Sequence, residues 1–212
     1  MNKYYEEVRK FLKNYLFSKD NIDEVEKQYR YEHTLRVAAL GKQIAEKESL
    51  NEFIVVIGCL LHDVGKFDTE IGIDHGRVSA KVARNFLNTL NLSQEVIDEI
   101  CYGIAIHVDG KADFKFNGTI ECEIISDCDN IDRFDAYRIF DALRWDKFET
   151  LSNKDGITLL QNRIERLQQF LKENFSTKTS TEYFHDRVNI QISYYQQLLR
   201  QYESTYSYFN EE

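Results

Sequence analysis

The feature that most restricts the fold of this chain is the complete absence of proline from its 212 residues. Proline is the strongest helix breaker, because its ring fixes φ and its backbone nitrogen carries no hydrogen. Glycine is also scarce, with nine residues, so few tight turns are expected. We therefore predict an all-α fold.

Apolar side chains recur along most of the chain at the three- and four-residue spacing of amphipathic helices. Residues 25–48 carry one such stripe, on which His33 lies with Val37 and Leu40. The imidazole of His33 is therefore expected to face the core. Further helices are predicted over residues 4–17, 79–90 and 93–107, from residue 119 onward, and three times between residues 135 and 212.

A run of apolar residues at positions 53–61 leads directly into the pair His62-Asp63. The run would suit a buried strand or a buried helix, and we predict a helix because no partner strands are evident elsewhere. Its end brings an imidazole and a carboxylate to one place, and divalent zinc, iron and manganese accept both as ligands. The dipeptide alone is weak evidence, since it recurs at His185-Asp186 without a preceding apolar run.

Other side chains able to bind a metal lie on both sides of this pair. His33 and His107 each continue the buried stripe of a predicted helix, whereas His75 lies in a polar loop over residues 67–76. Asp129 lies on a buried stripe, where an unpaired carboxylate would be costly, so it is a candidate ligand. Asp127 competes with Asp129 for this role.

Three motifs place these residues in a characteristic order: EHTLRVAALGKQIA, LLHDVGK and IISDCDNIDRFDA. Through them the chain resembles the HD-domain superfamily of metal-dependent phosphohydrolases, over about residues 29–137. The resemblance implies an all-α, HD-like helical bundle that holds one metal ion. By this resemblance the ligands of that ion are His33, His62, Asp63 and Asp129.

Some members of the superfamily, such as dinucleoside-polyphosphate and cyclic-dinucleotide hydrolases, carry two more histidines and a second metal ion. His75 in DHGRVSA and His107 in IAIHVDG resemble that pair. Asp63 is then the natural bridge between two ions, because it adjoins His62 and has two carboxylate oxygens. We expect one or two divalent cations, and nitrogen and oxygen ligands suit manganese, iron, zinc, cobalt and nickel.

Two divalent ions about 3.5–4 Å apart can share a water molecule and lower its pKa, so that hydroxide exists near neutrality. Asp63 is therefore predicted to be catalytic, together with Lys66, which lies just beyond the ligands. Lys66 could contact a phosphate or the leaving oxygen, and a solvated lysine after a helix end is an equal alternative. Gly65 is expected to end the helix in a backbone conformation with positive φ.

We predict a phosphohydrolase that cleaves a phosphoester or phosphoanhydride of a small nucleotide by metal-activated water. One alternative is a catalytically retired sensory module that binds a nucleotide or a metal. The intact ligand set and Lys66 count against it, since a retired site need not keep them. Another alternative is a di-iron oxygenase on the same scaffold, which oxygen consumption would distinguish from phosphate release.

The formal charge of −9 argues against binding of a nucleic-acid polymer, which depends on clustered lysines and arginines. A small phosphorylated substrate is compatible with this charge, because bound divalent cations reverse the local field. The four cysteines form no C-x-x-C pair and are predicted to be reduced core thiols. No apolar segment resembles a signal peptide or approaches membrane-spanning length. We therefore predict a cytoplasmic protein with no membrane partner.

The chain length fits a single domain over residues 1–212. Within it we predict an HD-type core over about residues 25–145 and a C-terminal helical extension over about residues 146–212. The extension contains apolar stripes typical of paired helices, which are compatible with a monomer or a homodimer.

Overall fold

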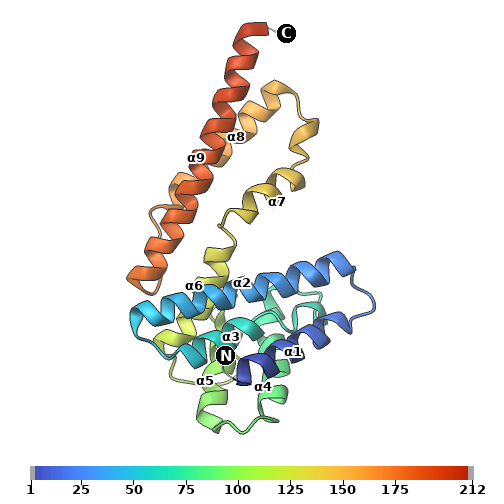
Figure 1. Cartoon of the computed structure of the whole chain (residues 1–212), viewed down its shortest axis with the longest axis vertical. Helices are drawn as coiled ribbons and strands as arrows, with labels where there is room; N and C mark the ends of the chain where they lie inside the picture. Colours follow the sequence, from blue (N-terminus) through green and yellow to red (C-terminus); the bar gives the residue numbers. More distant parts are fainter. Residues whose placement is uncertain (1–2, 210–212) are drawn as a thin grey trace. The chain divides into compact units, whose positions relative to one another are not determined.

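The computed structural model describes residues 3–209, and in that range it contains nine α-helices and no strand (Figure 1). The all-α prediction is therefore confirmed. The helices are α1 (Lys3–Phe17), α2 (Glu24–Glu48), α3 (Glu52–Leu61), α4 (His75–Leu87), α5 (Gln94–Ile106), α6 (Ile120–Asp132), α7 (Tyr137–Trp145), α8 (Asn153–Phe170) and α9 (Lys178–Phe209). Short 3-10 turns lie at η1 (Lys66–Asp68), η2 (Gly72–Asp74) and η3 (Phe148–Thr150). None of the described helices is both long enough and apolar enough to cross a membrane.

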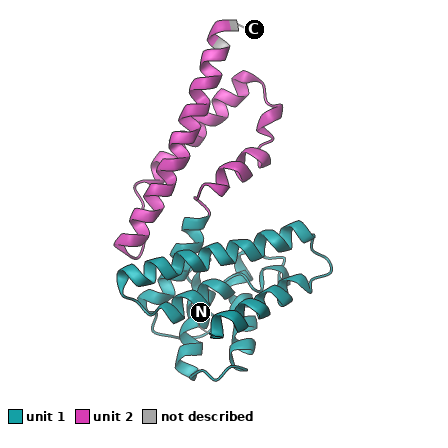
Figure 2. Cartoon of the chain, in the orientation of Figure 1, with its two compact units in different colours: residues 1–132 teal, residues 133–212 magenta. Residues whose placement is uncertain are grey.

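The chain divides into two compact units, Met1–Asp132 and Arg133–Glu212 (Figure 2). Unit 1 contains α1 to α6, and unit 2 contains α7 to α9. The division lies at the end of α6, earlier than the start of the extension expected near residue 146. That both units form one domain stays a prediction.

Helix α3 is the central helix of unit 1. Its side chains are buried continuously from Ile54 to Leu61, which explains why its sequence is apolar on all sides rather than amphipathic. Asn51 caps the start of the helix, because its side chain accepts a hydrogen bond from the backbone nitrogen of Phe53 at 3.1 Å. The interpretation of residues 53–61 as a helix is therefore confirmed.

Two glycines allow α6 to lie close to its neighbours. A Cβ atom at Gly58 of α3 would lie 2.1 Å from Ile125 Cδ1, and one at Gly103 of α5 would lie 2.5 Å from the same atom. The side chain of Ile125 in α6 therefore occupies the space that Cβ atoms at Gly58 and Gly103 would need. Asp129 lies one helical turn beyond Ile125, so this packing also positions its carboxylate.

The segment between α3 and α4 differs from the sequence-based expectation in two ways. Gly65 has a φ of −95°, so the prediction of a positive φ is wrong. Glycine is required there because a Cβ atom would lie 2.8 Å from the backbone nitrogen of Ser79. In addition, α4 begins at His75, so this histidine opens a helix rather than lying in a loop.

In unit 2, α8 and α9 pack side by side, as the apolar stripes predicted (Figure 1). Ser152 caps the start of α8, because its hydroxyl accepts a hydrogen bond from the backbone nitrogen of Asp155 at 3.2 Å. The buried apolar residues shared by the two helices are Leu160, Ile164, Leu167, Phe184, Val188, Ile192 and Tyr195.

Candidate metal centre

All six predicted ligand residues lie in unit 1, at the ends or on the inner faces of five helices. His33 lies in α2, His62 and Asp63 directly follow α3, His75 is the first residue of α4, His107 directly follows α5, and Asp129 lies in the last turn of α6. Five of them are buried, and the side chain of Asp129 is 15% exposed. The structure therefore brings together residues that are separated by as many as 96 positions in the sequence.

His33, His62 and Asp129 form one group of potential ligands. His33 Nε2 lies 3.0 Å from Asp129 Oδ1, and His62 Nε2 lies 3.7 Å from the same oxygen. One nitrogen or oxygen atom from each of the three residues lies within 4.8 Å of the others, a spacing at which one ion could contact all three. Asp63 Oδ2 lies next to this group, 3.8 Å from His33 Nε2 and 3.5 Å from His62 Nε2.

The other carboxylate oxygen of Asp63 faces the remaining two histidines. Asp63 Oδ1 lies 3.1 Å from His75 Nε2 and 3.8 Å from His107 Nε2. The two imidazoles approach each other, with 3.2 Å between their Nε2 atoms. Asp63 thus presents one oxygen to His33 and His62 and the other to His75 and His107, as a bridging carboxylate would.

Backbone carbonyl groups orient three of the four histidines. The Nδ1 atoms of His62 and His107 each lie 2.7 Å from the carbonyl oxygen three residues earlier in the chain, and His75 Nδ1 makes the same contact. A carbonyl oxygen can only accept, so Nδ1 carries the hydrogen in each ring. In the neutral imidazole Nε2 then keeps its lone pair and points into the site.

A carboxylate orients the fourth histidine. His33 Nδ1 lies 2.8 Å from Asp132 Oδ2, and Arg36 donates to both oxygens of Asp132, at 2.9 and 3.1 Å. Burial opposes the charge on Asp132, but hydrogen bonds from His33 and Arg36 outweigh it and lower the pKa of that carboxyl. The structure places it against His33.

Three inward-facing atoms are buried and make no hydrogen bond in the described part of the chain, although another potential ligand atom lies 3.0–3.5 Å from each: His33 Nε2, His62 Nε2 and Asp63 Oδ1. Burying such polar atoms unpaired is costly, and native proteins rarely leave them so. Two imidazole nitrogens and a carboxylate oxygen that converge in this way form a suitable donor set for a divalent cation. These residues therefore fit a metal ion.

Comparison with known families identifies the domain that contains these residues. Residues 30–134 match the HD domain, a range that includes all six candidate ligands. The chain belongs to the HD-domain superfamily. A comparison with curated proteins gave no significant match.

Solved structures with a similar fold cover nearly the whole chain. A predicted HD superfamily hydrolase from an uncultured Thermotogales bacterium is 20% identical, with a TM-score of 0.67 and coverage of 93% of this chain and 92% of that chain. An HD-superfamily hydrolase from Bacillus thuringiensis is 17% identical, with a TM-score of 0.68 and coverage of 95% and 97%. Bacillus subtilis YpgQ in complex with ADP is 21% identical, with a TM-score of 0.63 and coverage of 93% and 94%. At these identities the likeness establishes the fold.

In the HD site, which consists of the six candidate ligand residues, His62 and Asp63 stabilise each other's charged forms. Burial opposes charge on His62, but Asp63 and Asp129 outweigh it and hold the pKa of the imidazole well above its usual value. Burial likewise opposes charge on Asp63, but His62 and Arg30 hold the pKa of that carboxyl well below its usual value.

Arg30 is a residue of the HD site that sequence reasoning missed. Its NH1 pairs with Asp63 Oδ2, and its Nε is buried without a hydrogen-bond partner in the described structure. The signal was its position three residues before His33, on the same face of α2. Arg30 places a guanidinium group beside the proposed bridging carboxylate.

The other three residues considered from the sequence have different surroundings. Lys66 Nζ lies 3.1 and 3.3 Å from the two ring nitrogens of His75, so it faces the site. Asp127 is buried but belongs to neither of the two groups of potential metal ligands, which are His33 with His62 and Asp129, and His62 with Asp63 and His107. His185 lies in unit 2, where its Nε2 is 2.9 Å from the carbonyl oxygen of Glu173.

Proposed function

We propose that this chain is a metal-dependent phosphohydrolase that cleaves a phosphoester or phosphoanhydride bond of a small nucleotide. The observation that carries the proposal is the convergence of buried ligand atoms of His33, His62 and Asp63 that make no hydrogen bond. A site that served only to stabilise the fold would pair these atoms, because leaving them unpaired costs free energy.

The six ligand residues would hold one or two divalent cations. His33, His62, Asp63 and Asp129 would hold one, and Asp63, His75 and His107 would hold a second. When bound, such cations act as Lewis acids on phosphate oxygens and lower the pKa of a bound water to near neutrality. The backbone carbonyls behind the histidines and Asp132 behind His33 keep the imidazoles in the orientation that binding requires.

Arg30 and Lys66 would bind and orient the phosphate group. A guanidinium group can donate two parallel hydrogen bonds to phosphate oxygens, and the ammonium group of Lys66 acts as a compact positive charge. Both groups already face the ligand residues, since Arg30 pairs with Asp63 and Lys66 lies beside His75. Lys66 would stabilise the leaving oxygen or a phosphate oxygen.

A nucleotide is the proposed substrate class, and the similar structure of YpgQ was solved in complex with ADP. Because the chain has a formal charge of −9, binding of an anionic substrate depends on the local positive charge of Arg30, Lys66 and bound cations. We propose that the protein acts on such small phosphorylated molecules in the cytoplasm and not on nucleic-acid polymers.

The test combines metal analysis with a substrate panel. Elemental analysis of the purified protein should find a divalent transition metal, and phosphate or pyrophosphate release should then be measured for nucleoside mono-, di- and triphosphates and dinucleotides. Release should require the metal, proceed without oxygen, and be lost in His62→Ala and Asp63→Ala while His185→Ala retains it. Equal release by all three variants, or oxygen consumption with no phosphate release, would refute the proposal.

A further inference from the structure

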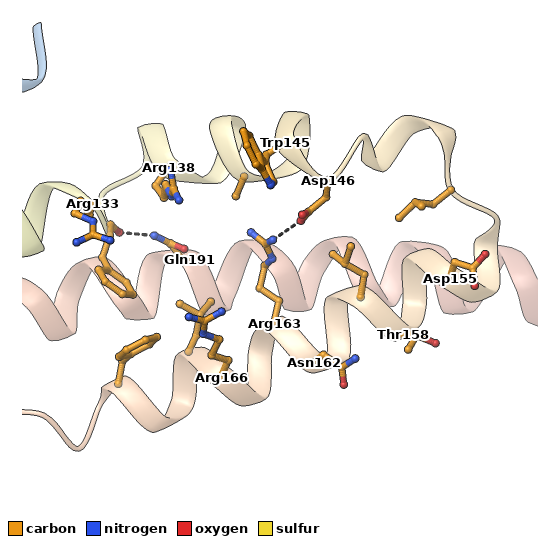
Figure 3. A pocket seen from close by; sticks show the side chains of 16 residues that line it. Arg133, Arg138, Trp145, Asp146, Asp155, Thr158, Asn162, Arg163, Arg166 and Gln191 are labelled. Carbon is orange, nitrogen blue, oxygen red and sulfur yellow. Dashed lines mark hydrogen bonds and ion pairs between the residues drawn. The ribbon is translucent and has the colours of Figure 1, made fainter. Parts of the chain in front are cut away.

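Unit 2 contains a cavity of about 670 Å³ that none of the candidate metal ligands lines. Its volume lies within the range of about 300–1,000 Å³ that is typical of small-molecule sites. The walls come from residues 133–134, from α7 and the segment after it, from one face of α8, and from Gln191 of α9 (Figure 3). The cavity is thus a second concave site, built entirely from unit 2.

Two sets of polar contacts hold the walls of this cavity in place. Arg163 of α8 forms an ion pair with Asp146, directly after α7, and donates a hydrogen bond to the hydroxyl of Tyr195 at 3.3 Å. Gln191 donates to the carbonyl oxygen of Phe134 at 2.6 Å (Figure 3). Because α7, α8 and α9 are tied together in the absence of a ligand, binding would cost little reorganisation.

The cavity has a surplus of positive charge. Four arginines and two aspartates line it, whereas the chain as a whole has 27 basic and 36 acidic residues. Within the described range, neither Arg133 nor Arg166 takes part in an ion pair or a hydrogen bond. Arg138 pairs with Asp141, but both side chains are well exposed, and such pairs contribute little. Three guanidinium groups are therefore available to an anion.

Aromatic side chains accompany these arginines. Trp145 at the end of α7 is 86% exposed, although tryptophan has a large, mainly apolar side chain. Phe134 and Phe170 form an edge-to-face pair in the cavity wall, with 4.7 Å between their ring centroids. An exposed indole offers a surface on which a planar ring can stack.

We propose that this cavity binds a nucleotide, with its phosphates against Arg133, Arg138 and Arg166 and its base against Trp145. Arginine suits this role because its planar group pairs with phosphate oxygens through two hydrogen bonds. The proposal goes beyond the hydrolysis assigned to the HD site, since it concerns binding without turnover. Neither group of potential metal ligands lines this cavity, so binding should not need a divalent cation.

The test uses the only tryptophan in the chain, Trp145, as a reporter of the cavity. ATP titrated into the full-length protein with EDTA present should change Trp145 fluorescence in a saturable way, with matching heat in calorimetry. Tripolyphosphate should bind more weakly than ATP, and adenosine should bind weakest. The double variant R133Q/R166Q should raise the Kd of ATP by at least about tenfold, because it removes two charged hydrogen-bond donors to the phosphates.

Arg144→Gln is the matched control, because Arg144 is an exposed arginine of α7 that does not line the cavity. It should leave the Kd of ATP unchanged, and circular dichroism should show that all variants are folded. His62→Ala should also bind ATP as the wild type does, so the loss of hydrolysis and the loss of this site are separate outcomes. No saturable binding in EDTA, or an unchanged Kd in R133Q/R166Q, would overturn the proposal.

Discussion

At the scale of single residues, the HD site depends on oxygen atoms that orient the histidine rings. Each histidine ring has its Nδ1 atom against an oxygen, and for His33 that oxygen belongs to Asp132. The bond fixes which ring nitrogen faces the ligands, and the pairing of Asp132 with Arg36 fixes the carboxylate in turn. The metal affinity of the site should therefore depend on a residue that does not itself contact the metal.

We expect Asp132→Ala to weaken binding of a divalent cation by about 10- to 100-fold, because His33 loses the partner that orients its ring. Titration of Mn²⁺ or Zn²⁺ by calorimetry, with circular dichroism to show that the variant is folded, measures this change. Asp113→Ala is the control, since Asp113 is an exposed residue of unit 1 that pairs with Lys81. Equal metal affinities for the two variants would contradict the orienting role of Asp132.

Cys101 should be inert in the folded protein. Burial raises the pKa of its thiol from 9.0 to about 12, so at pH 8 the reactive thiolate should be about a thousandfold rarer than in the unfolded chain. Alkylation by iodoacetamide at pH 8, followed by peptide mass spectrometry, should label Cys101 in denaturant and not in native buffer. Rapid labelling of the native protein would contradict this prediction.

The same pKa shift predicts the sign of a pH dependence. The folded chain binds the Cys101 proton more tightly than the unfolded chain does. The stability that this thiol contributes is therefore complete below pH 9.0 and is lost as the pH rises toward about 12. The difference in unfolding free energy between wild type and Cys101→Ala should shrink over that range, and a difference that grows with pH would be inconsistent with a buried, protonated thiol.

The six candidate ligands could be identified from the sequence, whereas their supporting partners could not. Five of the six lie on a buried stripe or next to an apolar run, which local periodicity reveals, whereas His75 was indicated by the resemblance to the HD-domain superfamily. Arg36 and Asp132 are separated by 96 positions, so no local pattern pairs them. Arg30 was missed for the same reason, because its contact with Asp63 exists only once α2 packs beside the end of α3.

At the scale of helices, glycines determine how closely the elements that carry ligands approach one another. Gly65 follows Asp63 by two positions, and its backbone nitrogen donates to Ser79 Oγ of α4 at 3.0 Å. A Cβ atom there would meet the α4 backbone rather than a movable side chain. A larger residue would therefore push α4, and with it His75, away from Asp63.

We expect Gly65→Ala to destabilise the protein by about 1–3 kcal/mol, the usual cost of overpacking, and to weaken metal binding as well. Thermal unfolding and metal titration measure the two effects. Gly72→Ala tests whether any glycine in this segment would do the same, because a Cβ atom at Gly72 meets nothing within 4 Å. If the two variants behaved alike, close packing at Gly65 would not be the cause.

The start of α4 shows why element boundaries were harder to predict than the elements themselves. The sequence around His75 and Gly76 is polar and contains glycine, which is typical of a loop. In the fold, a Cβ atom at Gly76 would lie 2.8 Å from the carbonyl oxygen of Ala105, so this glycine serves the packing of α4 against α5. Tertiary packing therefore overrides local propensity here, and the helix starts four residues before the predicted position.

At the scale of the whole molecule, the two compact units carry different proposed binding chemistry. Unit 1 groups imidazoles and carboxylates that suit cations, and unit 2 groups arginines and an exposed indole that suit an anion with a planar ring. Asp132, which orients His33, is the last residue of unit 1, and Arg133, which lines the cavity, is the first of unit 2. These two residues are adjacent in the sequence.

The prediction that both units form a single domain implies cooperative unfolding, and metal binding tests it. A cation at about 100 times its Kd should stabilise the folded chain by about 2.7 kcal/mol, because it binds only that state. Ellipticity at 222 nm reports helices in both units, and Trp145 fluorescence reports unit 2 alone. If unfolding is cooperative, Mn²⁺ should raise both midpoints equally, and His33→Ala should abolish both shifts while His185→Ala retains them. A shift in ellipticity without a shift in Trp145 emission would mean that unit 2 unfolds independently.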